Sequence, residues 1–158
     1  MTTKTFDGSY RHTQPGTLIR NVTLGLTVLF AGLGIVWLRP FLFFVVPILL
    51  IIAWLFHSLT IEIDKGELRW RFGPGLVRKS VPLEEIITAK PVRTNLLEGW
   101  GIHPSRYGWL YNVSGFDAVA VTLRNGKYFA LGTDEPQALA TRLTNCHGST
   151  FSRTGLTS

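Results

Sequence analysis

Charged residues are scarce in this chain, and their distribution is uneven. Only 16% of the 158 residues are Asp, Glu, Lys or Arg, against roughly 25% in an average soluble chain. Residues 21–38 contain no ionisable side chain, and neither do residues 41–56. Apolar runs of this length exclude an ordinary soluble globule and an intrinsically disordered chain.

Cysteine is also nearly absent, because Cys146 is the only one. A single cysteine cannot close an internal disulfide or build a thiolate metal cage, so a disulfide-stabilised secreted scaffold is excluded. The four histidines are scattered without the spacing of metal ligands: they are His12, His57, His103 and His147. We therefore expect no metal and no cofactor.

No arrangement typical of a catalytic site is found. Glu84 and Glu85 are adjacent, and neighbours on a strand point to opposite faces. Ser114 lacks the pattern of a nucleophile elbow, and the glycines at 99 and 101 lack the third glycine of a phosphate-binding loop. We expect no enzymatic activity and no small-molecule substrate. A net charge of +6 without a dense basic patch also argues against nucleic acid as a partner.

Two apolar runs separated by Arg39-Pro40 are the most informative feature. A membrane-spanning helix needs about 20 residues, within a range of about 17 to 25. Proline disfavours helix in the residue before it, and arginine at the bilayer centre costs at least about 2.5 kcal/mol. The sequence therefore predicts a transmembrane helical hairpin over residues 18–58, with helices at about 18–38 and 41–58. A secretory signal peptide is the alternative for the first run, although no A-x-A cleavage site follows it.

Features within the two runs refine this prediction. Gly25, Gly32 and Gly34 are expected to let the helices approach closely, although glycine is common in membrane helices for other reasons. Pro47 is expected to kink the second helix. Lys and Arg are concentrated before and after the hairpin, and the turn carries only Arg39. By the positive-inside rule, both termini are predicted to lie in the cytoplasm.

After the hairpin, apolar and polar residues alternate, which is typical of half-buried strands. Residues 59–64 and 67–72 are predicted to pair across Lys65-Gly66, so that Ile61 faces Trp70. Residues 117–133 are predicted to form a second hairpin. A three-residue loop over 124–126 would leave Gly126 left-handed, with Val121 opposite Phe129.

The remaining segments complete a predicted domain over residues 59–143. Further strands are expected within 77–81, 83–93 and 108–113, whereas 95–107 is expected to be a loop. A helix is predicted to begin near Thr133 or Asp134, with Leu139 and Leu143 facing inward. Residues 1–17 would form a cytoplasmic N-terminal segment, and residues 144–158 a flexible tail.

Several segments and their order resemble the bacterial pleckstrin-homology-like (PH-like) membrane proteins. They are Gly99-Trp100-Gly101-Ile102, Gly108-Trp109-Leu110-Tyr111-Asn112-Val113-Ser114-Gly115, Asn125-Gly126-Lys127 and Gly132-Thr133-Asp134-Glu135-Pro136. The resemblance covers residues 57–143 and implies a membrane-anchored α+β protein. Its domain would be a seven-strand antiparallel β-barrel or sandwich capped by a C-terminal helix, at the bacterial plasma (inner) membrane. It implies little about activity, because fold does not fix function.

Two sets of residues are candidate binding sites. Aromatic and basic residues around a Gly/Pro-containing loop are typical of a protein-binding patch, and are Trp100, His103, Arg106 and Tyr107. Basic residues on the first two-stranded hairpin and the next strand are candidates for anionic lipid headgroups, and are Lys65, Arg69, Arg71, Arg78 and Lys79.

The main functional hypothesis is a non-catalytic, membrane-anchored interaction module. It would help to assemble or regulate a membrane complex, by presenting a sheet edge or the aromatic loop to another membrane protein or a second copy. The alternative is a domain that binds or senses anionic headgroups at the cytoplasmic surface. Salt dependence separates the two, because headgroup binding weakens as salt screens the charges.

Overall fold

The computed structural model describes residues 9–37, 40–95 and 100–151, with only the helical backbone for residues 146–151. The chain begins with a strand, continues into a helical hairpin and returns to a second strand. The elements are β1 (Tyr10–Pro15), α1 (Thr17–Val36), the 3-10 helix η1 (Pro40–Phe44), α2 (Val45–Leu55) and β2 (Ser58–Asp64).

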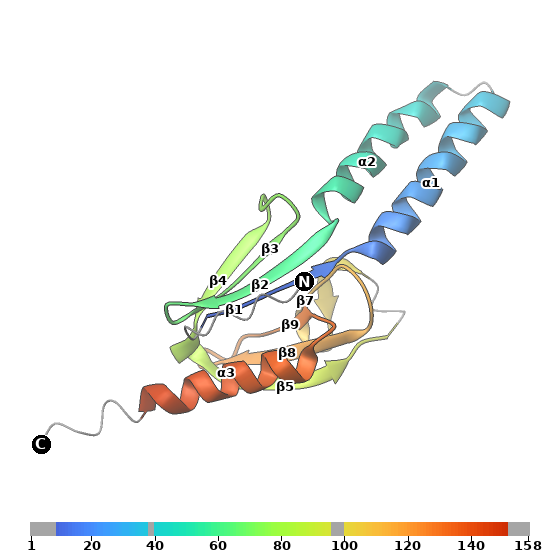
Figure 1. Ribbon diagram of the computed structural model, residues 1–158. Helices are drawn as coiled ribbons and strands as arrows, with labels where there is room; N and C mark the ends of the chain where they lie inside the picture. The colour runs from blue at the N-terminus through green and yellow to red at the C-terminus, as the bar shows by residue number, and fades with distance from the viewer. Residues whose placement is uncertain (1–8, 38–39, 96–99, 152–158) are drawn as a thin grey trace, which may run out of the picture.

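The helical hairpin is inserted between two paired strands (Figure 1). β1 and β2 are antiparallel neighbours, and Pro15 at the end of β1 lies opposite Ser58 at the start of β2. The Gly16 amide donates to the His57 carbonyl over 2.7 Å, so pairing continues to the base of the helices. β1 was not predicted, and it makes residues 10–15 part of the domain.

The second helical run differs from the predicted continuous helix over 41–58. It begins as a 3-10 helix, and its α-helical part ends at Leu55. Pro47 is the third residue of α2, where a missing N–H is tolerated, and the expected kink stays a prediction. Of the described helices, only α1 is long and apolar enough to cross a membrane. A signal sequence near an N-terminus meets the same criterion.

The first sheet has the strand order β1-β2-β3-β4, where β3 is Glu67–Phe72 and β4 is Arg78–Pro82. The predicted register is confirmed, because Ile61 pairs with Trp70 and Glu62 with Arg69.

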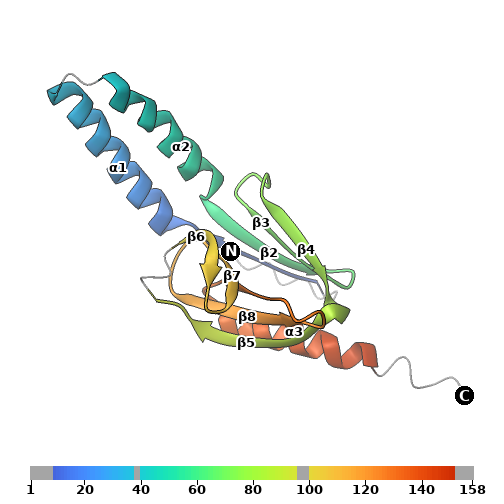
Figure 2. The same ribbon diagram turned by 180° about the vertical axis from the view of Figure 1, so that it is seen from behind.

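The second sheet has the order β5-β8-β9-β7-β6. After the short 3-10 helix η2 (Leu83–Glu85), its strands are β5 (Ile86–Arg93), β6 (Gly101–Ser105), β7 (Gly108–Asn112), β8 (Asp117–Leu123) and β9 (Tyr128–Gly132). The predicted three-residue loop is confirmed: Val121 pairs with Phe129, and Gly126 has a φ of +78°. Figure 2 shows β6 and β7 beside each other on the side away from α3.

The predicted seven-strand antiparallel β-barrel or sandwich is correct only in part, because the described strands form two packed sheets and not a closed barrel, and their number and pairing differ from the prediction. The described residues form nine strands in separate four- and five-stranded sheets, and β7 and β9 are parallel. β6 lies within the segment predicted as loop. The α+β class and the C-terminal helix agree with the prediction.

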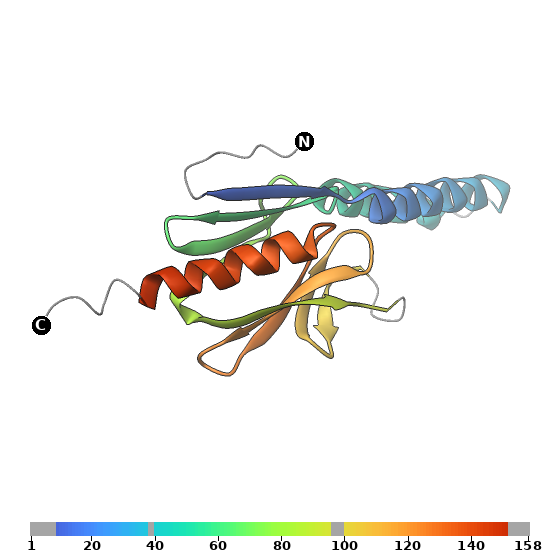
Figure 3. The same ribbon diagram turned by 60° about the horizontal axis from the view of Figure 1, so that its bottom comes forward.

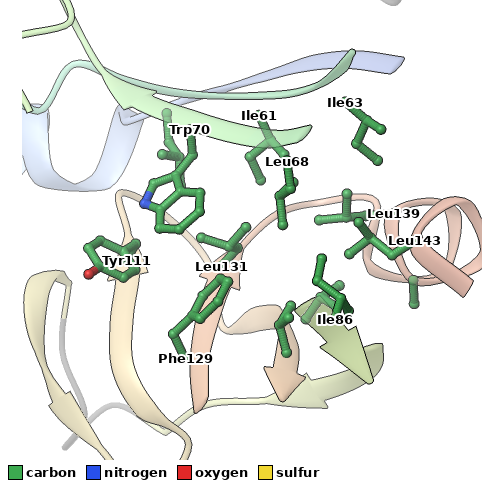
Figure 4. Close-up of a cluster of buried hydrophobic side chains, with 14 of the residues drawn as sticks. Ile61, Ile63, Leu68, Trp70, Ile86, Tyr111, Phe129, Leu131, Leu139 and Leu143 are labelled. Atoms are coloured by element: carbon green, nitrogen blue, oxygen red, sulfur yellow. The ribbon is translucent and has the colours of Figure 1, made fainter. Parts of the chain in front are cut away.

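The core lies between the two sheets and is closed by α3 (Pro136–Phe151). Trp70 of the first sheet stacks on Phe129 of the second, with ring centroids 4.9 Å apart (Figure 4). Leu139 and Leu143 are fully buried from α3, as predicted. The helix continues to Phe151, beyond the predicted end near residue 143. Figure 3 shows the helical hairpin leaving one end of the domain and the C-terminal end of α3 pointing toward the other.

Candidate functional site

The domain has two distinct ends, which decide what its basic residues can contact. We call the end where β1 meets α1 and α2 meets β2 the hairpin end; Pro15, Ser58 and Phe72 lie there. The turn Lys65-Gly66 marks the far end. Since β2 has seven residues, the ends are separated by about 20 Å at roughly 3.3 Å per residue.

The five headgroup candidates do not form one cluster. Arg69, Arg71 and Arg78 line a concavity of about 460 Å³ over β2, β3 and β4. Lys65 lies in the far-end turn. Lys79 also borders the concavity, but its Nζ donates to the Tyr111 hydroxyl, 2.7 Å away in the other sheet.

Carboxylates neutralise part of this basic surface. Arg69 Nε donates to Glu67 Oε2 over 2.8 Å, and this hydrogen bond raises the pKa of the Arg69 guanidinium. Glu62 lies 3.1 Å from Arg11 and 3.9 Å from Arg71. Within the described ranges, no carboxylate lies within ion-pair distance of Arg78. At the hairpin end, Arg78 therefore lies opposite its register partner Arg71, which shares Glu62 with Arg11.

The loop between β3 and β4, residues 73–77, lies against the end of α2. The Gly73 amide donates to the Ser58 carbonyl over 2.8 Å. A Cβ on Gly73 would lie 2.6 Å from the Leu55 carbonyl oxygen, and φ at Gly73 is +41°. A side chain at this position would therefore push the loop away from the helix. Leu76 in this loop is 72% exposed.

Two of the candidate protein-binding residues, Trp100 and Arg106, make contacts within the domain. The Trp100 indole donates to the Gly115 carbonyl over 3.0 Å. Arg106 donates to the Arg93 carbonyl over 3.0 Å and lies over the Tyr107 ring. Substitution of Trp100 or Arg106 therefore removes internal contacts as well as any contact with a partner.

Other members of that segment differ in exposure. Tyr107 packs on a small buried cluster around Leu110. His103 has a buried Nε2 without a hydrogen-bond partner among the described residues. Trp109 is 52% exposed, whereas Tyr111 is buried.

A polar cluster that the sequence analysis missed joins β1 to the start of α3. His12 is buried, and its Nε2 lies 2.5 Å from Asp134 Oδ1. Glu135 lies 3.7 Å from the other ring nitrogen. Burial raises the pKa of the neighbouring Tyr10 well above its usual range, and the charges of Glu135 and Asp134 add to the effect. The sequence gives little indication of this cluster, because His12 and Asp134 are more than 120 positions apart.

The described part of the chain holds no group of three or more His, Cys, Asp or Glu side chains that could bind a metal. Cys146, His147 and Gly99 fall where side chains or placement are outside the described structure. Glu84 and Glu85 lie in η2 rather than on a strand.

Comparison with protein-family models, with curated proteins and with solved structures finds no match. The PH-like resemblance therefore remains a prediction based on the segments quoted above.

Proposed function

We propose that this protein is a non-catalytic, PH-like interaction module held at the cytoplasmic face of a bacterial plasma membrane by a helical hairpin. The observation that carries the membrane placement is the outward-facing apolar surface of the hairpin. None of the residues of η1 or α2 is buried, and Val28, Ile35 and Phe44 are 67–75% exposed. An apolar surface of this extent is stable when lipid covers it.

The lengths of the helices fit this placement. At 1.5 Å per residue, α1 is about 30 Å long, which equals the usual hydrocarbon thickness. The 3-10 helix rises about 2.0 Å per residue, so Pro40–Leu55 extends over about 26 Å. The second arm is therefore close to a full span despite its short α-helical part.

The pairing of β1 with β2 favours a retained hairpin over a cleaved signal sequence. Cleavage after α1 would remove β1 from the first sheet and break the contact between His12 and Asp134. A retained hairpin is connected to the domain by two chain segments, one from β1 and one to β2. The excess of Lys and Arg on the domain side of the hairpin favours a cytoplasmic location for both termini.

We propose that another integral membrane protein binds to the β4 edge of the first sheet. Among the described strands, β4 pairs only with β3, and Arg78, Lys79 and Ser80 are exposed. A partner segment could add a strand to this edge through main-chain hydrogen bonds. The basic side chains would favour an acidic partner segment and oppose edge-to-edge aggregation.

Site-directed photocrosslinking in native membranes tests this proposal. In a Cys146→Ser background, a thiol-linked photocrosslinker is placed at Ser80→Cys and, as a control, at Asn125→Cys on the exposed turn between β8 and β9. We expect a discrete adduct with a membrane protein from position 80 alone, which is reproduced when that protein is co-reconstituted. A lack of adduct at position 80, or equal adducts at both positions, would contradict the proposed edge.

A further inference from the structure

The loop at residues 73–77 is held beside the base of the hairpin rather than projecting freely. Gly73 is hydrogen-bonded to Ser58, and the Phe56 and Phe72 rings meet edge to face, with centroids 5.2 Å apart. Figures 1 and 2 show the loop between β3 and β4 rising to the level of the last turn of α2. Any bilayer that covers α2 therefore meets this loop.

The loop and its flanks combine an apolar residue with positive charge. Leu76 is among the most exposed large apolar side chains outside the hairpin. Arg71 and Arg78 face each other across the strands immediately below the loop. Trp54, on the last turn of α2, is 56% exposed, and tryptophan is enriched at membrane interfaces. These features match an interface of acyl chains and anionic phosphates.

We propose that the 73–77 loop is a second membrane contact, with Leu76 inserted into the interfacial region of the bilayer and Arg71 and Arg78 bound to anionic phospholipid headgroups. This inference rests on the membrane placement of the hairpin. The contact would hold the hairpin end of the first sheet at the bilayer and fix the direction in which the β4 edge is presented.

The far end of the domain supplies matched controls. Lys65 lies about 20 Å further from the hairpin end along β2, well beyond the ~8 Å Debye length at physiological salt. Ile87, at the start of β5, is 52% exposed and pairs near Leu123, at the end of β8 remote from the hairpin. Lys65 carries the same charge as Arg71 and Arg78, and Ile87 is apolar like Leu76, but neither can reach the bilayer that covers the hairpin.

The test uses the full chain in vesicles of phosphatidylcholine with or without phosphatidylglycerol. In the Cys146→Ser background, an environment-sensitive label is attached at Leu76→Cys, at Ile87→Cys or at Ile48→Cys on α2. A quencher carried by lipid headgroups then reports contact with the interface, and one carried by the acyl chains reports contact with the bilayer interior, where position 48 would lie. We expect strong quenching at position 76, stronger in anionic vesicles, and little at position 87.

Charge variants test the role of the arginines. A basic residue near an anionic surface strengthens association by roughly fivefold. We expect Arg71→Gln and Arg78→Gln each to reduce the docked-to-undocked ratio at position 76 by roughly fivefold, and Lys65→Gln to leave it unchanged. High salt should weaken docking in the wild-type loop.

Three failures are distinguishable. If the label at position 48 is unquenched by the acyl-chain quencher, the hairpin is not in the bilayer and the proposed function itself fails. If position 48 is quenched while position 76 behaves like position 87, the hairpin stands and the second contact is overturned. Equal loss from Lys65→Gln and Arg78→Gln would overturn the headgroup assignment.

Discussion

Tyr10 illustrates how a residue outside the predicted domain contributes to it. Its ring packs against the core from β1, and its buried hydroxyl has no hydrogen-bond partner within the described residues. Burial raises its pKa in the folded protein, whereas an unfolded tyrosine titrates near its ordinary value of about 10. The folded state thus holds the proton more tightly than the unfolded state does.

This difference predicts an alkaline loss of stability. Below about pH 10 both states are protonated and stability is unaffected. As pH rises above that value, the unfolded state loses the proton first, so the free energy of unfolding falls. Tyr10→Phe should remove this fall and change stability near neutral pH by about 1 kcal/mol or less, because the lost hydroxyl has no partner. Denaturant unfolding of the detergent-solubilised protein between pH 7 and 11 measures both effects. An identical alkaline fall in Tyr10→Phe would contradict the assignment.

The candidate binding residues show what a sequence pattern leaves undecided. Arg69 and Arg71 alternate correctly on β3, so their common face was predictable. Their carboxylate partners were harder to predict. Arg69 forms its ion pair with Glu67 on its own strand and not with Glu62, which lies opposite on β2. The bond from Lys79 to Tyr111 joins two sheets, and local alternation does not define how two sheets pack.

Glycines of the hairpin have different surroundings despite their similar sequence context. A Cβ on Gly34 would lie 3.1 Å from the Phe43 ring across the hairpin, whereas one on Gly25 would meet nothing within 4 Å. The expected close approach of the helices therefore depends on Gly34.

This contrast predicts different outcomes for two substitutions of the same kind. Gly34→Leu should separate α1 from η1 and lower the thermal stability of the detergent-solubilised protein. Gly25→Leu should leave it nearly unchanged, because a Cβ at Gly25 meets nothing within 4 Å. Thermal unfolding of both variants and the wild type measures the difference. Equal destabilisation by the two substitutions would contradict the observed helix packing.

Strand prediction succeeded where pairing is local and failed where it is not. The β2–β3 and β8–β9 hairpins follow from alternation and a short turn, and both registers are confirmed. β1 has little apolar alternation, and its partner β2 is separated from it by the entire helical hairpin. β6 contains Gly101 and Pro104 and pairs only with β7 among the described strands, so its sequence resembles a loop.

The molecule as a whole is a two-sheet domain in which the connection between β1 and β2 is a helical hairpin. Because β1 and β2 pair up to the base of the helices, the domain is joined to the hairpin by two adjacent chains rather than one flexible linker. We infer that the domain has a set orientation at the membrane. This orientation would keep the 73–77 loop at the bilayer and the Lys65 turn away from it.

Cysteine accessibility in intact and permeabilised cells tests this arrangement most directly. In the Cys146→Ser background, Phe41→Cys marks the turn end of the hairpin and Ser80→Cys marks the domain. We predict that a membrane-impermeant maleimide labels position 41 in intact cells, and position 80 only after permeabilisation, with both proteins resisting alkaline extraction. Labelling of position 80 in intact cells, or release of the protein by alkaline extraction, would contradict a membrane-inserted hairpin with a cytoplasmic domain.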